Sequence, residues 1–219
     1  MAFTPKRLGI AILVVSSLLV IYETWRVLEV RNRTPALLVR VSDRADPQLA
    51  NLNRTFIDIL IAVEDPTFWS NDGLDFTTPG QGLTTLTQAL AKQLYFDRFT
   101  PGFQKLELLL LAKYALTPSA TKQEILTAFL TLAYLGQDEF GPVIGFPQAA
   151  RRWHGKNLAE LDDSEFISLV AMLPMPNSLD PINHAQENKI RSLRIQRLIS
   201  GSCEPSGLTD VMLDGCQAP

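Results

Sequence analysis

Two short polar stretches hold the residue types that could do chemistry. The first is the acidic pair Glu64–Asp65, which follows the apolar run FIDILIAV. The second is GLTTLTQALAKQ at residues 82–93, where hydroxyls, an amide and a cation gather. A carboxylate after a buried helix can have a raised pKa, which suits a general base. Cations and hydrogen-bond donors can stabilise a charged leaving group. Together the two stretches indicate group transfer from a phosphorylated donor.

Each stretch also has a purely structural interpretation. The polar candidates of the second stretch could simply cap and solvate a helix: Thr84, Thr85, Gln88 and Lys92. The acidic pair could likewise solvate the end of a helix. The residues alone leave both interpretations open.

A further acid, Glu107, lies among leucines in KLELLLLAKYA. A carboxylate in apolar surroundings costs free energy unless it is paired or faces a cavity. We therefore expect Glu107 to line one groove with Glu64 and to approach Lys92 or Lys105. The alternative is an exposed glutamate on an amphipathic helix.

Helical periodicity dominates the elements that must position these residues. Apolar spacing predicts helices at residues 49–64, 84–95, 103–116, 121–135, 162–173 and 186–200. Glycines and prolines make residues 70–82 a loop. No segment alternates like a strand, so the sequence predicts an all-α chain.

Composition narrows the function further. A chain of 219 residues with 46% hydrophobic residues can bury one good-sized domain and carry an appendage. The net charge of −3 argues against a nucleic-acid partner. The two histidines, His154 and His184, lack the spacing of a zinc site.

The N-terminus resembles a membrane anchor. Lys6 and Arg7 precede an uncharged run at residues 8–22, and Trp25 follows it. As a helix the run covers about 22 Å, and snorkelling cations and an interfacial tryptophan can extend it toward the thickness of a bilayer core. We expect an uncleaved signal anchor at residues 1–22. A cleaved signal peptide and a buried soluble helix are the alternatives.

The rest of the chain divides into three parts. Residues 23–47, with Pro35 and Pro47, are expected to form a charged, irregular connector. Residues 48–200 form the domain, and residues 201–219 form a tail with the two cysteines, Cys203 and Cys216. In an exported protein these cysteines would pair; otherwise they are two free thiols.

Taken together, the segments resemble glycosyltransferase family 51, the peptidoglycan glycosyltransferases, across residues 49–199. EDPTFWSNDGLD is similar to the first motif of the family and GLTTLTQALAKQ to the second. QKLE falls where the third motif carries a second glutamate. KQEILTAFLTLAYLG and the stretch from IGFPQAARRW to NSLDP are similar to the segments that follow.

The resemblance implies a lysozyme-like, bilobal, all-α domain with a single-pass anchor in the bacterial inner membrane, on the periplasmic side. It implies polymerisation of lipid II with inversion and release of undecaprenyl pyrophosphate. Glu64 would deprotonate the acceptor hydroxyl, and Glu107 would assist departure of the pyrophosphate, with Mg²⁺ or Mn²⁺ as the implied cofactor. Partners would be lipid II, the membrane and other cell-wall synthesis proteins. The implied substrate-binding residues are Asp65, Phe68, Asn71, Thr84, Thr85, Gln88, Lys92 and Lys105.

The chain also departs from the family pattern. Asn71 stands where the first motif has histidine, and Phe103 and Gln104 replace an Arg-Lys pair. Smaller departures are Ala89, Gln93, Thr131 and a shortened stretch between Gly73 and Gly82. Three hypotheses follow: an active glycosyltransferase, a non-catalytic relative that binds lipid II or a partner, and a lysozyme-like lytic enzyme. The last gives no reason for Lys92 beside threonines.

Overall fold

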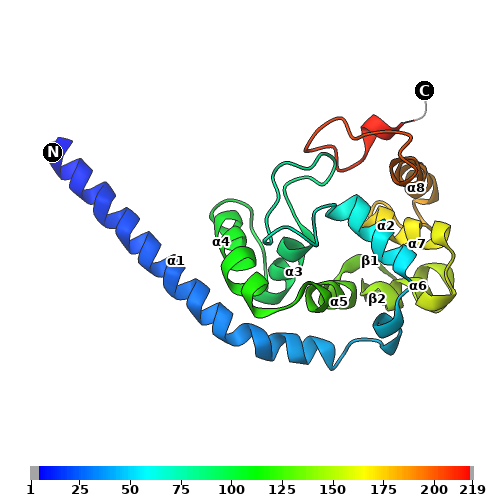
Figure 1. Ribbon diagram of the computed structural model, residues 1–219, viewed down its shortest axis with the longest axis horizontal. Coiled ribbons are helices and arrows are strands. Elements are labelled where there is room, and N and C mark those ends of the chain that lie inside the picture. Colours follow the sequence, from blue (N-terminus) through cyan, green and yellow to red (C-terminus); the bar gives the residue numbers. More distant parts are fainter. Residues whose placement is uncertain (1–4, 218–219) are drawn as a thin grey trace.

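The computed structural model describes residues 5–217 and consists mostly of helices (Figure 1). The first helix, α1 (Pro5–Ser42), extends away from the body that the other elements build. These are α2 (Arg54–Glu64), α3 (Leu86–Tyr95), α4 (Phe103–Leu111), α5 (Lys122–Leu132), α6 (Phe146–His154), α7 (Asp163–Met172) and α8 (Ala185–Ile199). A π-helical turn, Ala112–Leu116, continues α4, and short 3₁₀ turns span Pro47–Asn51, Thr117–Ser119, Leu158–Glu160 and Asp214–Cys216.

Side-chain caps fix where several helices begin. Thr85 accepts a hydrogen bond from the Gln88 amide at the start of α3. The capping box of Asp162 and Glu165 opens α7, as its sequence pattern predicts. Because the caps satisfy amides that a helix leaves free, the starts of α3 and α7 agree with the expected ranges within two residues.

The core lies around α7, which packs against α2, α6 and α8. Phe166 of α7 stacks on Phe56 of α2 with ring centroids 4.2 Å apart, and Phe146 of α6 lies 5.5 Å from Phe166. All three rings are essentially inaccessible to solvent. This packing holds the C-terminal end of α2, where Glu64 lies, in a fixed position.

The expectation of an irregular connector is wrong, since α1 runs without a break to Ser42. Its C-terminal half packs on α4, the π-helical turn and α5. Val30 is buried against Leu111 and Ala115, and the Thr34 and Tyr95 hydroxyls lie 2.8 Å apart. Tertiary packing therefore maintains the helix although Pro35 removes one donor.

The chain is mostly helical as expected, but the expectation that no segment forms a strand is wrong. β1 (Tyr134–Asp138) and β2 (Gly141–Ile144) form an antiparallel hairpin, so α5 ends before residue 135. The chain returns closely over the end of α5 at Gly145, where a Cβ would lie 2.6 Å from the Thr131 carbonyl oxygen. This approach depends on residues distant from the local pattern, which is why helical periodicity missed the hairpin.

Two terminal features agree with expectation. Cys203 and Cys216 form a disulfide, which closes a loop at the C-terminal end of the body. Among the described residues, one helix, α1, is both long enough and apolar enough to cross a membrane. Length and composition support that reading, and no bilayer is part of the structure.

Candidate active site

A cavity of about 440 Å³ opens where the end of α2 meets the start of α3. Glu64 from α2 and Lys92 from α3 both line it. The loop before α3 contributes Gln81 and Thr84, and α8 contributes Arg191. The cavity thus brings together a carboxylate, hydroxyls and cations from segments that are far apart in the sequence.

Glu64 is the last residue of α2, and its side chain is 24% exposed. Burial raises the pKa of Glu64 above its ordinary value, Arg191 opposes the rise, and Asp65 adds to it. A carboxylate with a raised pKa accepts a proton more readily than an ordinary one. Glu64 thus lies on the cavity wall with a raised pKa, and its role as the general base stays a prediction.

Asp65 joins α2 to α3 instead of lining the cavity. Its carboxylate accepts hydrogen bonds from the Leu86 amide at 3.0 Å and from the Asn71 amide group at 2.7 Å. Asn71 in turn accepts a hydrogen bond from Lys122 at 2.9 Å. Burial is the largest influence on Asp65 and raises its pKa to about 6. The asparagine at the motif's histidine position therefore bridges a carboxylate and a lysine.

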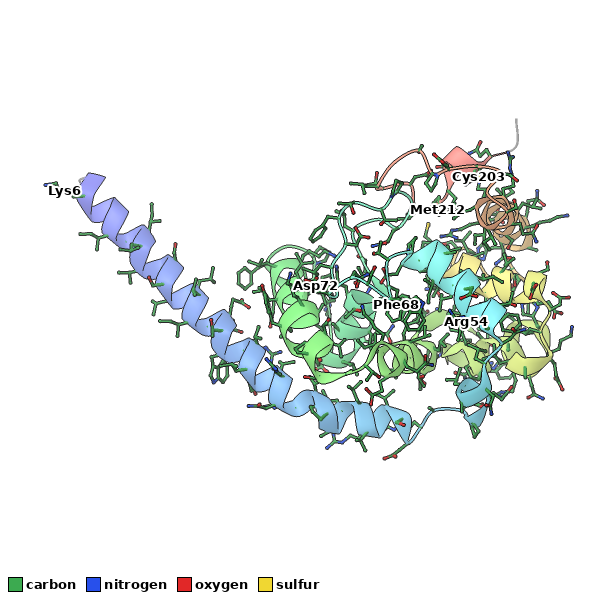
Figure 2. The ribbon with its side chains drawn as sticks, viewed as in Figure 1. Lys6, Arg54, Phe68, Asp72, Cys203 and Met212 are labelled. Carbon is green, nitrogen blue, oxygen red and sulfur yellow. A yellow bond between two sulfur atoms is a disulfide. The ribbon has the colours of Figure 1, made fainter. Side chains whose placement is uncertain are left out.

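Phe68 is fully buried, and the Lys122 ammonium lies 4.7 Å from its ring centroid. Figure 2 shows Phe68 between α2 and α3. Asp65, Phe68 and Asn71 are absent from the lining of the cavity. Direct substrate contact by these three residues stays a prediction, whereas their structural role is visible.

Several residues that were expected to bind phosphate lie close together at the start of α3. Lys105 donates hydrogen bonds to the Leu83 carbonyl at 3.0 Å, the Thr84 hydroxyl at 3.3 Å and the Gln88 side-chain oxygen at 3.0 Å. Burial, followed by the charge of Lys92, lowers the pKa of Lys105. Lys105 therefore holds the loop that carries Thr84, while Lys92 is the exposed cation on the cavity wall.

The two threonines differ in what they offer. Thr85 is fully buried, donates to the Gly73 carbonyl at 2.7 Å and accepts from the Gln88 amide at 3.1 Å. Its hydroxyl is thus already used in the fold, as the capping interpretation suggested. Thr84 is exposed beside Lys105 and is the hydroxyl better placed for a ligand.

Glu107 has a partner that the sequence did not suggest. Its carboxylate accepts a hydrogen bond from Arg26 of α1 at 2.9 Å, and Arg26 also lies 3.4 Å from Glu29. The expected pairing with Lys92 or Lys105 is therefore wrong. Residues two apart on a helix face different sides, so Lys105 faces α3 whereas Glu107 faces α1. Glu107 is buried and does not line the cavity with Glu64.

The Arg26–Glu107 pair allows a direct test. We expect Arg26→Met to lower the free energy of unfolding by about 2 kcal/mol, because Glu107 would keep a buried carboxylate without its partner. Urea unfolding of the detergent-solubilised protein measures the change. Arg31→Met is the matched control, since Arg31 is exposed on the same helix and has no ion pair among residues 5–217. Equal midpoints for the two variants would show that the pair contributes nothing.

Sequence reasoning missed Arg26, Lys122 and Arg191. Arg191 could have been identified from the sequence, because it lies on the same face of α8 as Asn188 and Ile195, both of which are buried. A cation on the buried face of a helix signals a buried partner. Arg26 and Lys122 gave no such signal, since their partners are set by tertiary packing.

The described part of the chain contains no group of three histidine, cysteine, aspartate or glutamate side chains that could hold a metal ion. Glu107 is paired with Arg26, and Asp65 already accepts two hydrogen bonds. The protein residues on their own therefore do not fit the expected divalent cation.

The chain is similar to known proteins over most of its length. A family model described as Transglycosylase matches residues 34–199. The chain is 27% identical over 189 residues to a Cupriavidus necator protein named "Putative transglycosylase", covering 79% of this chain and 80% of that protein. It is 28% identical over 153 residues to penicillin-binding protein 2a of Streptococcus pneumoniae, covering 66% of this chain. It is 29% identical over 156 residues to penicillin-binding protein 1B of Vibrio cholerae, covering 65% of this chain.

The matches to the two penicillin-binding proteins span only 20% of each of those chains. The family match, in contrast, covers most of this chain and includes every residue of the cavity described above except Val211. The helical body has the lysozyme-like fold expected of that family. The chain belongs to the transglycosylase family, glycosyltransferase family 51, the family of peptidoglycan glycosyltransferases.

Proposed function

We propose that this chain polymerises lipid II into glycan strands. The observation that carries the proposal is a single cavity that contains the Glu64 carboxylate, the Thr84 hydroxyl and the Lys92 ammonium. Glu64 takes the proton of an acceptor sugar hydroxyl, and the freed oxygen attacks the anomeric carbon of the donor. Because the oxygen attacks from the face opposite the pyrophosphate, the configuration inverts as the bond from that carbon to the pyrophosphate breaks, and undecaprenyl pyrophosphate leaves.

The cavity offers charge where this reaction develops it. The leaving pyrophosphate is anionic, and Lys92 lies on the wall with Thr84 beside it. Fixed cations and donors stabilise such a leaving group more than mobile water does. Lys105 adds positive charge behind Thr84, although three oxygens already occupy its donors.

Two parts of the expected mechanism stay predictions. Assistance by Glu107 would have to act through its ion pair with Arg26, because the carboxylate does not line the cavity. Use of Mg²⁺ or Mn²⁺ finds no three-ligand set among the described residues. We therefore assign no step to either.

Incubation of the purified, detergent-solubilised protein with lipid II tests the proposal. We expect glycan polymer on a gel. Binding of lipid II without polymer would instead support a non-catalytic relative, which the uncharged Phe103 and Gln104 and the neutral Asn71 favour. Cleavage of preformed glycan strands would support the lytic alternative.

We also propose that residues 8–22 hold the chain in the inner membrane with the domain on the periplasmic side. An apolar stretch at the start of α1 and a disulfide both suit this location. Protease added to spheroplasts should digest the domain. Protection of the domain would reverse the orientation, and a soluble periplasmic species beginning near residue 23 would show cleavage.

A further inference from the structure

The disulfide-closed loop, residues 203–216, packs against the loop that borders the cavity. The Gly80 amide donates to the Gly207 carbonyl at 2.9 Å, and the Gly82 amide donates to the Leu208 carbonyl at 2.8 Å. Both glycines have positive φ, and a Cβ on Gly82 would lie 2.7 Å from the Val211 side chain. Figure 2 shows Cys203 and Met212 on the same side of the body, with Cys203 beside α8. Val211 itself lines the cavity.

Arg191 connects this loop to the candidate base. Its side chain is only 3% exposed. One terminal nitrogen, Nη2, donates to the Val211 carbonyl at 2.8 Å and lies 3.7 Å from the Glu64 carboxylate. The other nitrogens, Nε and Nη1, are buried without a hydrogen-bond partner in the described part of the chain. The guanidinium is thus held by one carbonyl of the loop and directed at Glu64.

Burying a guanidinium with unpaired donors is costly, so stability alone gives little reason for an arginine here. An apolar side chain of similar size would fill the space at lower cost. The nearby Arg194 makes the contrast clear, because it ties α8 to the same loop without reaching Glu64. It donates to the Met212 carbonyl at 2.9 Å and pairs with Asp214 at 2.7 Å.

We propose that Arg191 is a positioning residue for Glu64, and that the disulfide-closed loop holds Arg191 in place through the Val211 carbonyl. The inference rests on the proposed function of Glu64 as the general base. It adds a cation on α8 and a segment C-terminal to the family match to the machinery around the cavity.

The charges that face Glu64 determine the expected effect. Asp65 at the end of α2 is a like charge, Arg191 of α8 is the opposite charge in contact, and Lys92 of α3 and Tyr134 of β1 share the cavity wall. Arg194 and Asp210 face Arg191 in turn. Because burial raises the pKa of Glu64 and Arg191 opposes the rise, losing Arg191 moves that pKa further up. A base works in its ionised form, so the acid limb of kcat/KM should move to higher pH.

The experiment is a carbon-13 NMR titration of protein labelled at the glutamate side-chain carboxyl carbon, in detergent micelles. Glutamate labelling excludes signals from the neighbouring Asp65, whose pKa burial also raises. The Glu64 signal is assigned by its loss in Glu64→Gln. An opposite charge at this distance shifts a carboxyl pKa by about 1–3 units, so Arg191→Gln should raise the Glu64 midpoint by about one unit or more. Arg191→Lys keeps the positive charge, so its Glu64 midpoint should lie close to the parental value. Arg197→Gln removes the same charge from the same helix away from the cavity and should leave the midpoint at its parental value.

Removing the disulfide tests the role of the loop separately. Cys203→Ser with Cys216→Ser should raise the Glu64 midpoint in the same direction as Arg191→Gln but by less, because the Val211 carbonyl then loses its fixed position. A parental midpoint in the serine double variant would overturn the role of the loop. A parental midpoint in Arg191→Gln would overturn the positioning role of Arg191.

If Arg191→Gln folds too poorly for NMR, the free energy of unfolding provides a second test. The loss of stability caused by Arg191→Gln should be smaller in a Glu64→Gln background than in the parental protein, since the two side chains interact. Equal losses in the two backgrounds would contradict the contact. Neither measurement needs turnover, so a protein that shows the shift yet never polymerises lipid II would refute the proposed function and not the coupling.

Discussion

Glu64→Gln is expected to lower the rate of lipid II polymerisation by about 10²–10⁴-fold, the usual contribution of a general base. Glutamine keeps the size and the acceptor oxygen of glutamate but cannot take the proton of the acceptor hydroxyl. The raised pKa of Glu64 adds a second expectation, because the carboxylate is protonated as the pH falls through that pKa. The parental rate should therefore decrease toward acid pH. Initial rates with fluorescent lipid II across a pH series measure both effects.

Glu187→Gln serves as the control for this variant, since Glu187 is exposed in the first turn of α8. It should polymerise at the parental rate. Circular dichroism and lipid II binding establish that Glu64→Gln remains folded and keeps its substrate site. A Glu64→Gln variant that polymerises as fast as the parental protein would remove Glu64 from the mechanism.

The second large effect that we expect is an increase in the polymerisation rate. Restoring the family's Arg-Lys pair with Phe103→Arg and Gln104→Lys is expected to raise polymerisation, by up to about 10²-fold, since one preorganised contact of this kind can contribute that much. Phe103 is half-exposed, and Gln104 accepts a hydrogen bond from the Thr100 amide at the start of α4. Both positions adjoin Lys105, which reaches the Thr84 loop. New cations would add positive charge to the first turn of α4, the turn from which Lys105 reaches the Thr84 loop.

The matched control places the same added charge elsewhere. Leu193→Arg with Gln196→Lys puts two cations on the exposed face of α8 and should leave the rate unchanged. If the restored variant folds and binds lipid II but is no faster, the shortened loop at residues 73–82 becomes the next explanation. If neither protein polymerises and both bind, the chain is a non-catalytic relative.

The sequence predicted what depends on neighbouring residues. The helical stripes of α2, α3, α7 and α8 and the capping box at Asp162 were readable because side chains three and four apart determine them. The cavity was predictable in part, since Glu64, Thr84 and Lys92 lie in two motifs that the chain brings together.

What the sequence did not reveal depends on packing between distant segments. The partner of Glu107 lies 81 positions away in α1, and no local pattern connects Arg26 to it. The hairpin after α5 depends on where Gly145 meets the end of that helix. Asn71 looked like a lost histidine, whereas the fold uses its amide to join Asp65 to Lys122. In each case a local pattern identified the residue but not its neighbour.

The continuity of α1 has a geometrical consequence for catalysis at a bilayer. The apolar start of the helix and the half that packs on α4 and α5 belong to one continuous helix, which Figure 1 shows changing direction where it meets the body. From residue 23 to Ser42 that helix rises about 30 Å along its axis and contains Pro35. Because the C-terminal half is held on α4 and α5, the helix would set how far above the lipid headgroups the cavity lies in any membrane that α1 crosses. A donor and an acceptor that are both anchored in that bilayer by their lipid chains would then meet Glu64 at the same height. The length of this part of α1 would determine that height.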